Sequence, residues 1–523
     1  MVIFKKKSTS QVCLLTKRTF EVSGEEASAY QSFDLPLPRI HPDERLRRQL
    51  SFRNNSRFFW RDCDNGGGKI YSVYSPAVQF PVYSFEKWLE FRDKGEVYSR
   101  EFVFEKPFFE QFYLLWSKTP RSPCVVRGST GVRAAHGVHD VKNSFLIFDA
   151  RDSESCFYSV GVWNSKKCID CYLVYSSKNC YECVACRDSS SLRWSDSCID
   201  CHDSYFLKDC ESCRDCLFSV GLKNAEFCVF NEQLSEEEYQ QKVKELSLSS
   251  VHGLESAKGV FARFVNEQVK GQSGGFFTQG LGLSYCVDGK GLYNCSELYK
   301  AKNCIDGCGF GGDIDNSAQF VSAGGKAKAI INCVDCFDNV SNLNYCIDCD
   351  NSRDLFACVG LSNSEYCIFN TQFAKSEYRR LRDKIVSHLK KKHIWGVAFP
   401  AVFSSFAYNH STANSLMPLN EVQAQMLEYR WEADEDVVRP TQLLAGVEDA
   451  PGDRFSENPL SLDSIDVDNI SGKIFLCEMT GSPFQYSQEE VSFYLENGIA
   501  PPQRAFNQRH SERSVRLAEC AKV

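Results

Sequence analysis

The chain has 523 residues, 43% of them hydrophobic and 24% charged, with 27 cysteines and a formal net charge of -8. These values exclude a disordered polypeptide, a short disulfide-rich miniprotein and a uniformly basic nucleic-acid-binding protein. At roughly 100–200 residues per domain, the length predicts about three or four modules.

The sequence is typical of a protein from a reducing compartment. It has no run of about 18 uncharged apolar residues, and the basic residues near its start are not followed by the apolar segment of a signal peptide. We therefore expect a cytoplasmic protein without a membrane span. In that setting the cysteines are thiols or metal ligands and do not form a disulfide lattice.

Residues 1–120 are expected to form an N-terminal module with a degenerate zinc ribbon and helices. Residues 1–61 contain twelve Lys or Arg against six Asp or Glu. This basic, aromatic segment is either a surface for RNA, the ribosome or another polyanion, or a helix face that pairs with acidic residues elsewhere in the chain. The second role is usual for a charge run, and we favour it. The candidate polyanion-binding residues are Arg39, Arg45, Arg47, Arg48, Arg53, Arg57, Arg61, Phe58 and Trp60.

Residues 121–232 contain a repeat with a step of three. From residue 125 on, small or apolar residues recur at every third position, and all twelve cysteines of 125–232 fall on these positions. This period fits neither an amphipathic helix nor an alternating strand, but it fits a chain that winds around one axis. We therefore predict a β-solenoid with small side chains in its bore. Its predicted bore thiols are Cys156, Cys168, Cys171, Cys180, Cys183, Cys186, Cys198, Cys201, Cys210, Cys213, Cys216 and Cys228. Cysteine separations of 12, 15, 18 and 30 leave the residues per turn and the handedness open, with 18 preferred.

A second copy of the repeat is predicted at 283–370. Its end matches the end of the first copy at an offset of 139, and the glycine-rich stretch around Gly307–Gly312 breaks the register. The predicted bore thiols of this copy are Cys346, Cys349, Cys358 and Cys367. The fold class predicted from both copies is mainly β: a duplicated cysteine-rich β-solenoid with helical caps, flanked by small α+β degenerate zinc-ribbon modules.

Helices are expected beside each repeat. Pro107 begins a helix at the junction with the first repeat. A capping box of Ser235 and Glu238 begins a capping helix within 233–282, which continues as a linker, and 371–395 form a second capping helix. Residues 396–470 are predicted to be a linker, aromatic at first, where it packs back on the second repeat, and acidic later.

The C-terminal module, 471–523, repeats the N-terminal one at an offset of 464, as Cys13 and Cys477 or Arg45 and Arg509 show. The pattern indicates a zinc ribbon that has lost ligands. Beside Cys13 the other ligand places hold Thr16, His41 and Glu44, and beside Cys477 they hold Thr480, Ala505 and Gln508. Because tetrahedral zinc prefers sulfur and nitrogen ligands, we expect both modules to fold without metal.

These motifs together resemble a family of cysteine-rich proteins with β-solenoid repeats and degenerate zinc ribbons from candidate-phyla (Patescibacteria-like) bacteria. The resemblance rests on LPLPRIHPDERLRRQLSFRNNSRFFWRDCD, FEKPFFEQF, the CIDC and CYEC run, YCIFNTQF, GVAFPAVFSSFAYNHS and CEMTGSPF, which span nearly the full length. It implies the architecture and a bacterial setting but no mechanism.

The residues predict a non-enzymatic protein without a cofactor. In the cysteine register, Val, Leu, Ser and Ala replace Cys, which favours structural thiols over a zinc site or redox chemistry. The nine histidines are scattered, and no nucleophile motif is present. We expect a scaffold that presents extended solenoid surfaces to a protein or polymer partner. The alternatives are an RNA- or ribosome-associated factor and a thiol metal-binding or redox protein. The outward aromatics Phe157, Trp163, Tyr175, Tyr181, Tyr205 and Phe206 are candidates for partner contact or for packing.

Overall fold

The computed structural model describes residues 8–93, 98–269, 286, 289–298, 301–309, 314–322, 327–337, 340–434, 437–438, 442, 456–465, 470 and 473–520. Leu283, Gly311, Gly312, the linker at 270–282 and most of the acidic linker at 439–469 lie outside this range. The chain forms two compact units. Unit 1 comprises 1–54, 61–123 and 277–436, and unit 2 comprises 55–60, 124–276 and 437–523.

The predicted fold class is wrong. Helix and strand each contribute 28% of the structure, and the strands form several small parallel and mixed sheets, not a mainly-β solenoid. The cysteine repeat covers only part of the chain, and helices pack on the outer side of its strands. The fold is therefore mixed α and β.

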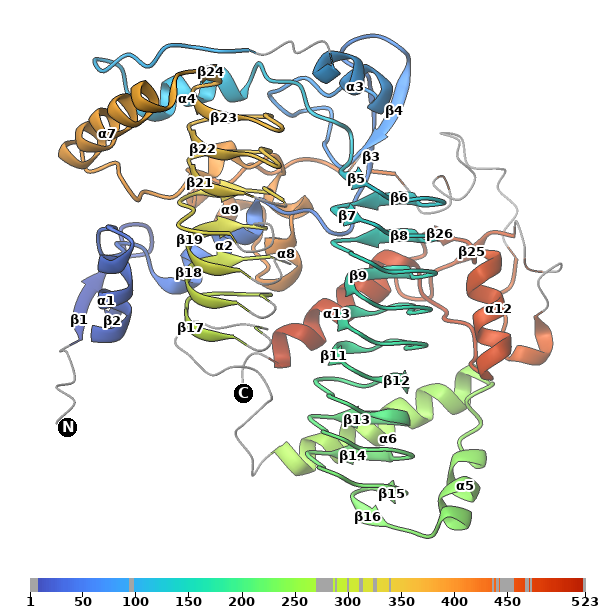
Figure 1. The fold of residues 1–523 in the computed structure, drawn as a ribbon. Helices are drawn as coiled ribbons and strands as arrows, with labels where there is room; N and C mark the ends of the chain where they lie inside the picture. Colours follow the sequence, from blue (N-terminus) through green and yellow to red (C-terminus); the bar gives the residue numbers. More distant parts are fainter. Residues whose placement is uncertain are drawn as a thin grey trace. The chain divides into compact units, whose positions relative to one another are not determined.

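Unit 2 is built on a stack of short strands, which we call the first stack (Figure 1). Its strands are β5 (Val126–Arg127), β6 (Arg133–His136), β7 (Val138–His139), β8 (Phe145–Phe148), β9 (Phe157–Trp163), β10 (Tyr172–Tyr175), β11 (Val184–Arg187), β12 (Ser190–Arg193), β13 (His202–Lys208), β14 (Leu217–Val220), β15 (Cys228–Val229) and β16 (Glu232–Gln233). The remaining elements are α5 (Glu236–Lys244), α6 (Val251–Val269), η3 (Leu462–Ser464), β25 (Phe475–Leu476), β26 (Pro483–Phe484), α12 (Gln488–Asn497) and α13 (Phe506–Cys520).

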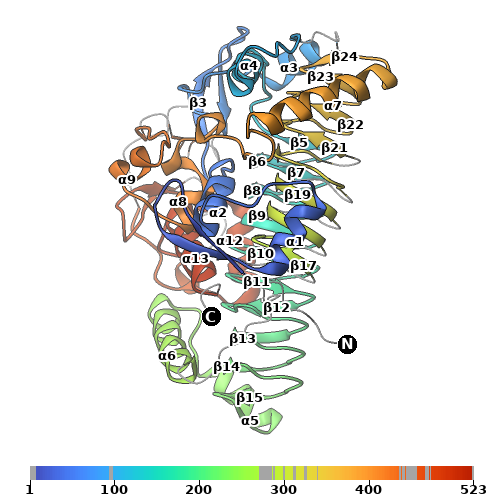
Figure 2. The ribbon, with the colours of Figure 1, turned by 90° about the vertical axis from the view of Figure 1, so that its left-hand side faces the viewer.

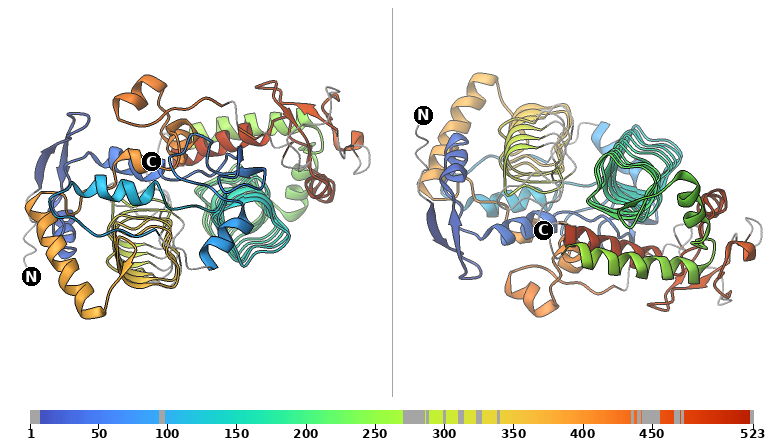
Figure 3. Two further views of the ribbon diagram at one scale, coloured as in Figure 1. Left: turned by 90° about the horizontal axis from the view of Figure 1, so that it is seen from above. Right: turned by 90° about the horizontal axis from the view of Figure 1, so that it is seen from below.

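Successive turns of the first stack pair in parallel at a step of 12 residues. Tyr172 pairs with Val160 on one side and with Val184 on the other. The preferred value of 18 residues per turn is therefore wrong. The cysteine spacing alone could not show this, because every multiple of three keeps the cysteines in phase. Viewed along the stack, the turns lie over one another (Figure 3).

A left-handed residue recurs at nearly every third position and turns the chain. Asn164, Lys167 and Asp170 have φ of 49°, 53° and 53°. Each 12-residue repeat therefore contains four left-handed residues. Asn, Asp and Gly adopt this conformation at the lowest cost, which explains why they are frequent at these positions.

Inward side chains bond the backbone as well as filling the interior. The Ser165 hydroxyl donates to the carbonyl of Trp163 (2.7 Å) and accepts from the backbone N–H of Ser177 (3.1 Å). The Cys156 thiol donates to the carbonyls of Glu154 (3.4 Å) and Ser165 (3.7 Å). Ser and Cys therefore suit these positions because they are small and can pair polar backbone atoms.

Unit 1 contains the second stack: β17 (Lys290–Tyr293), β18 (Lys302–Cys308), β19 (Asp315–Val321), β20 (Cys333–Val334), β21 (Ser341–Asn344), β22 (Arg353–Phe356), β23 (Glu365–Ile368) and β24 (Thr371–Gln372). The elements that precede it in the chain are β1 (Thr9–Val12), β2 (Thr19–Val22), α1 (Gly24–Ser32), α2 (Pro42–Ser51), β4 (Lys69–Ser72), α3 (Phe85–Asp93) and α4 (Phe108–Trp116). Those that follow are α7 (Lys375–Lys391), η1 (Ala401–Phe403), η2 (Tyr408–His410), α8 (Thr412–Leu416) and α9 (Glu421–Met426). Strand β3 (Phe59–Asp62) spans the boundary between the units.

Three pairings in the second stack have a step of 13, which explains the break in the sequence register. Cys304 pairs with Ser317, Phe320 with Cys333, and Ile331 with Asn344. Each extra residue shifts the inward-pointing positions by one residue relative to the repeat of three. After three such turns the original phase returns, and Leu343 pairs with Leu355 at a step of 12.

Helices follow both stacks as predicted. Ser235 and Glu238 form the capping box of α5, and Tyr239 packs on Phe227 with ring centroids 5.9 Å apart. In the second copy, Tyr378 of α7 packs on Tyr366 at 5.8 Å. The helix after Pro107 is also confirmed as α4, but Phe108 packs on Tyr345 and Phe356 of the second stack, so its expected junction with the first repeat is wrong.

The aromatic segment after α7 packs back on the second stack, as expected. Trp395 and Phe399 both lie against Tyr345, with centroids 6.0 and 5.9 Å apart. Among the helices of the described ranges, none combines the length and apolar character that a membrane crossing requires.

Candidate functional site

The predicted bore thiols point into the two stacks and are buried. Cys156, Cys168 and Cys183 have no accessible surface, and the same holds for Cys346 and Cys358. Burial raises the pKa of the Cys171 and Cys295 thiols and raises that of Cys286 to about 12. A protonated, enclosed thiol is a poor nucleophile, so this arrangement favours packing over reaction chemistry. Cys333 and Cys336 differ from these thiols because they form a disulfide.

The degenerate ribbon sites keep part of their ligand-like geometry. The Cys13 sulfur accepts hydrogen bonds from the backbone N–H groups of His41 (3.3 Å) and Thr16 (3.5 Å). In the second module the thiol of Cys477 faces Thr480 and Ala505. Burial raises the pKa of this thiol, but hydrogen bonds, among them those from Thr480 and Ala505, together lower it below its ordinary value. Hydrogen bonds thus occupy the sulfur where a ribbon would place its ion. Within the described part of the chain, no group of three or more His, Cys, Asp or Glu side chains is arranged to hold a metal.

The candidate polyanion-binding residues are divided between the two units. Arg39, Arg45, Arg47, Arg48, Arg53 and Arg61 belong to unit 1, whereas Arg57, Phe58 and Trp60 belong to unit 2. Arg47 bonds Glu44 (3.0 Å) and the Tyr408 hydroxyl (2.6 Å). Arg53 is buried against Glu297, and Arg61 pairs with Asp64 at 2.7 Å. Phe58 is buried on Phe148. Most of these side chains therefore hold unit 1 or unit 2 together.

One of these arginines, Arg45, lies at the centre of a buried ionic cluster on the second stack. Its guanidinium bonds Asp306 of β18 (2.5 Å) and Glu26 of α1 (3.2 Å). The Tyr30 hydroxyl donates to Asp306 and accepts from Arg45. Burial raises the pKa of Glu26, an effect that Arg45 opposes. We call these four residues the first lock, because they join the N-terminal module to the stack.

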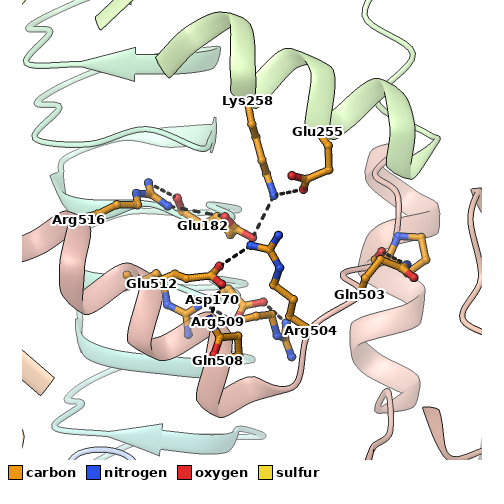
Figure 4. A network of polar contacts seen from close by, with 12 residues as sticks. Asp170, Glu182, Glu255, Lys258, Gln503, Arg504, Gln508, Arg509, Glu512 and Arg516 are labelled. Carbon is orange, nitrogen blue, oxygen red and sulfur yellow. Dashed lines mark hydrogen bonds and ion pairs between the residues drawn. The ribbon is translucent and has the colours of Figure 1, made fainter. Parts of the chain in front are cut away.

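The C-terminal module repeats this cluster on the first stack. Arg509 bonds Asp170 and Glu490 (3.0 Å), and the Tyr494 hydroxyl donates to Glu490 (2.6 Å). Glu490, Tyr494 and Arg509 stand 464 residues after Glu26, Tyr30 and Arg45. Figure 4 shows Asp170 and Arg509 within a larger ionic network. We call this cluster the second lock. Both copies thus use the same chemistry to bind a module to a stack.

Helices cover one corner column of the first stack. The column consists of left-handed residues 12 apart: Leu146, Tyr158, Asp170, Glu182, Trp194, Phe206, Phe218 and Phe230. Phe206 packs on Phe261 of α6 (5.7 Å), and Tyr158 packs on Phe506 of α13 (5.8 Å). Figure 2 shows α6 along the same stack.

This covering accounts for two of the predicted outward aromatics. Phe206 lies beneath α6, and Tyr181 packs on Tyr494 of α12 at 5.6 Å. Phe157, Trp163 and Tyr175 are also buried, and Tyr205 is half-buried. These side chains therefore serve packing and do not form an exposed platform.

Another face of the first stack stays exposed and carries two polar rows. One row is Asp140, Asp152, Asn164, Ser176, Asp188, Asp200, Ser212 and Asn224, and the other is Lys142, Glu154, Lys166, Lys178, Ser190, His202, Arg214 and Glu226. Neighbours along a row interact: Lys166 pairs with Glu154 at 2.9 Å, and Ser212 donates to Asp200 at 2.9 Å. We call this surface the two-row face. Successive turns place its side chains about 4.8 Å apart.

Unit 1 contains a cavity of about 870 Å³. It is enclosed by the N-terminal module, β18–β20 and the segment after α7. Its wall is mostly apolar, and Arg48, Gln49 and Gln319 are among the polar residues that reach it. Sequence reasoning missed this cavity because its walls come from segments some 300 residues apart.

The fold and these sites define a protein of two stack-and-module units with buried thiols and an exposed polar face. Comparison with protein-family models and with curated proteins finds no match for the chain.

Proposed function

We propose that the protein is a non-enzymatic scaffold that binds a protein or polymer partner through the two-row face. The observation that carries this proposal is the regular exposure of Asp, Asn, Ser and Lys side chains on successive turns. A rigid row of evenly spaced polar groups suits a partner that is itself extended and repetitive. It suits turnover of a small molecule poorly, because it offers no enclosed volume.

The other features of the chain support binding over the alternatives. The bore thiols donate to backbone carbonyls inside the stacks and have little contact with solvent. Arg45, Arg47, Arg53 and Arg61 are engaged within unit 1, so their placement gives no support to RNA contact. The proposal therefore rests on the outer surface of the first stack.

Affinity capture from the host with matched variants tests the proposal. Asp188→Asn combined with Asp200→Asn removes two charges from the two-row face and keeps residues that tolerate left-handed backbone. Glu237→Gln combined with Glu267→Gln makes the same charge change on exposed helical positions of unit 2. We expect a partner that the unaltered protein and the helix variant retain and that the face variant loses. Equal capture by all three proteins contradicts the proposal.

A further inference from the structure

The cavity in unit 1 lies at positions where the two copies of the module differ in chemistry. Three residues of its wall, Arg48, Gln49 and Phe52, come from the end of α2 and the residue after it. At the offset of 464, their counterparts in α13 are Glu512, Arg513 and Arg516. Both locks use a Glu, a Tyr and an Arg that stand 464 residues apart in the two modules. The same offset therefore aligns equivalent positions of α2 and α13.

In unit 2 these counterparts form ion pairs. Arg513 bonds Asp170 at 2.8 Å and Glu512 bonds Arg504 at 3.0 Å. Arg516 pairs with Asp196. Its guanidinium also lies 3.6 Å from the Glu182 carboxylate and donates to the Glu182 backbone carbonyl at 2.9 Å (Figure 4). The module and the first stack thus meet through charges of opposite sign.

In unit 1 both sides of this contact differ from those in unit 2. Gln319 follows Asp306 in its corner column, at the place that Glu182 holds after Asp170. Gln319 and Val334 line the cavity together with Phe52. Unit 1 thus has Gln319 in place of Glu182, and Gln49 and Phe52 in place of two arginines, and a largely apolar cavity lies where unit 2 has an ionic contact.

Arg48 is a half-buried cation of this wall, whereas Arg39, which also reaches the wall, is exposed. Within the described ranges the Arg48 guanidinium forms no ion pair, and its buried Nε has no hydrogen-bond partner. The buried Oε1 of Gln49 also lacks a partner. In contrast, Lys390 in the same wall pairs with Asp34. A buried polar atom without a partner carries a free-energy cost that a bound ligand can remove.

We propose that this cavity binds an apolar carboxylic acid, with its carboxylate on Arg48 and its hydrocarbon body against the apolar wall. Leu35, Leu37, Ile40, Phe320, Trp395 and Phe399 form that wall. The half-buried Arg48 guanidinium suits one carboxylate, which it can bind by a charge-assisted hydrogen bond. The volume falls within the range of sites that enclose ligands of this size.

Calorimetric titration of the full chain with n-decanoate and with n-decanol tests the proposal. The two probes share a hydrocarbon body and differ in the head group. Because hydrogen bonds to charged groups are the stronger class, we expect decanoate to bind about 10- to 100-fold more tightly than decanol. Arg48→Met is expected to abolish this preference and leave decanol binding unchanged, whereas Arg48→Lys retains part of it.

Arg380→Met is the matched control, because Arg380 is exposed on α7 in the same unit and lies outside the cavity wall. It should bind decanoate as the unaltered protein does. The proposal is overturned if the unaltered protein binds decanoate no better than decanol, a comparison that needs no variant to fold. It is also overturned if Arg48→Met keeps the full preference. Either result leaves the two-row face untouched, because that surface lies in unit 2.

Discussion

His510 of α13 is expected to make unit 2 sensitive to acid. Its ring is 3% exposed, lies between Tyr172 and Phe506, and has no hydrogen-bond partner at either nitrogen among the described residues. Burial lowers its pKa from 6.5 to about 3, and the nearby Arg513 and Arg57 act in the same direction. As the pH falls below 6.5, the unfolded chain therefore binds a proton that the folded chain excludes, and the free energy of unfolding falls until about pH 3.

The size of the effect follows from that shift. At about 1.4 kcal/mol per pH unit, the loss relative to neutral pH is about 1.4 kcal/mol at about pH 5.5 and about 2.7 kcal/mol at about pH 4.5. His510→Phe keeps an aromatic ring and removes the titrating group, so this part of the acid sensitivity should disappear. At neutral pH the substitution should change the free energy of unfolding by less than about 1.5 kcal/mol.

Urea unfolding at a series of pH values, followed by hydrogen exchange of peptides from the first stack, measures the difference. The other acidic groups titrate in both proteins, so only the gap between the two curves counts. The gap should widen as the pH falls from about 6.5 to about 4.5. Parallel curves for the two proteins would refute a buried, neutral His510.

Three further predictions concern the locks, the turns and the thiols. Arg45→Met and Arg509→Met each leave buried carboxylates without their cation and should destabilise their own unit by about 3–5 kcal/mol in urea unfolding; a loss below about 1 kcal/mol contradicts the locks. Asn164 has φ of 49° and is exposed, so Asn164→Val should cost about 1–2 kcal/mol while Asn164→Gly costs much less, and equal thermal stability of the two variants would rule out a left-handed turn there. Alkylation mapped by mass spectrometry should leave Cys171 and Cys183 unmodified until denaturant is added, because burial raises the pKa of both thiols; equal rates with and without denaturant contradict the enclosed arrangement.

The period of three, the duplication and the helix starts could be predicted from the sequence. The twelve cysteines in phase established which residues point inward, and Ser235 with Glu238 marked the start of α5. The number of residues per turn could not be predicted in the same way, since cysteines in phase at three are also in phase at 12 and at 18. The signal that was missed is the excess of Asn, Asp and Gly two positions after each inward residue, which marks the left-handed turns.

Only the module residues of the two locks could be recognised in the sequence. Tyr30 with Tyr494 and Arg45 with Arg509 match at the offset of 464, but their stack partners Asp306 and Asp170 carry no such mark. Acidic residues recur along both stacks, and only the folded chain selects which of them meets an arginine. The cavity could not be predicted for a related reason, because it depends on which uncharged side chains of distant segments meet in the folded chain.

The 13-residue turns of the second stack have a consequence for how such a protein changes over evolutionary time. A single inserted residue shifts the inward positions by one, yet the strands above and below remain paired. Since each turn depends mainly on its two neighbours, a lineage can lengthen, shorten or locally distort the structure in small steps without losing the whole. Such proteins should therefore differ among related genomes chiefly in length and in the position of such insertions.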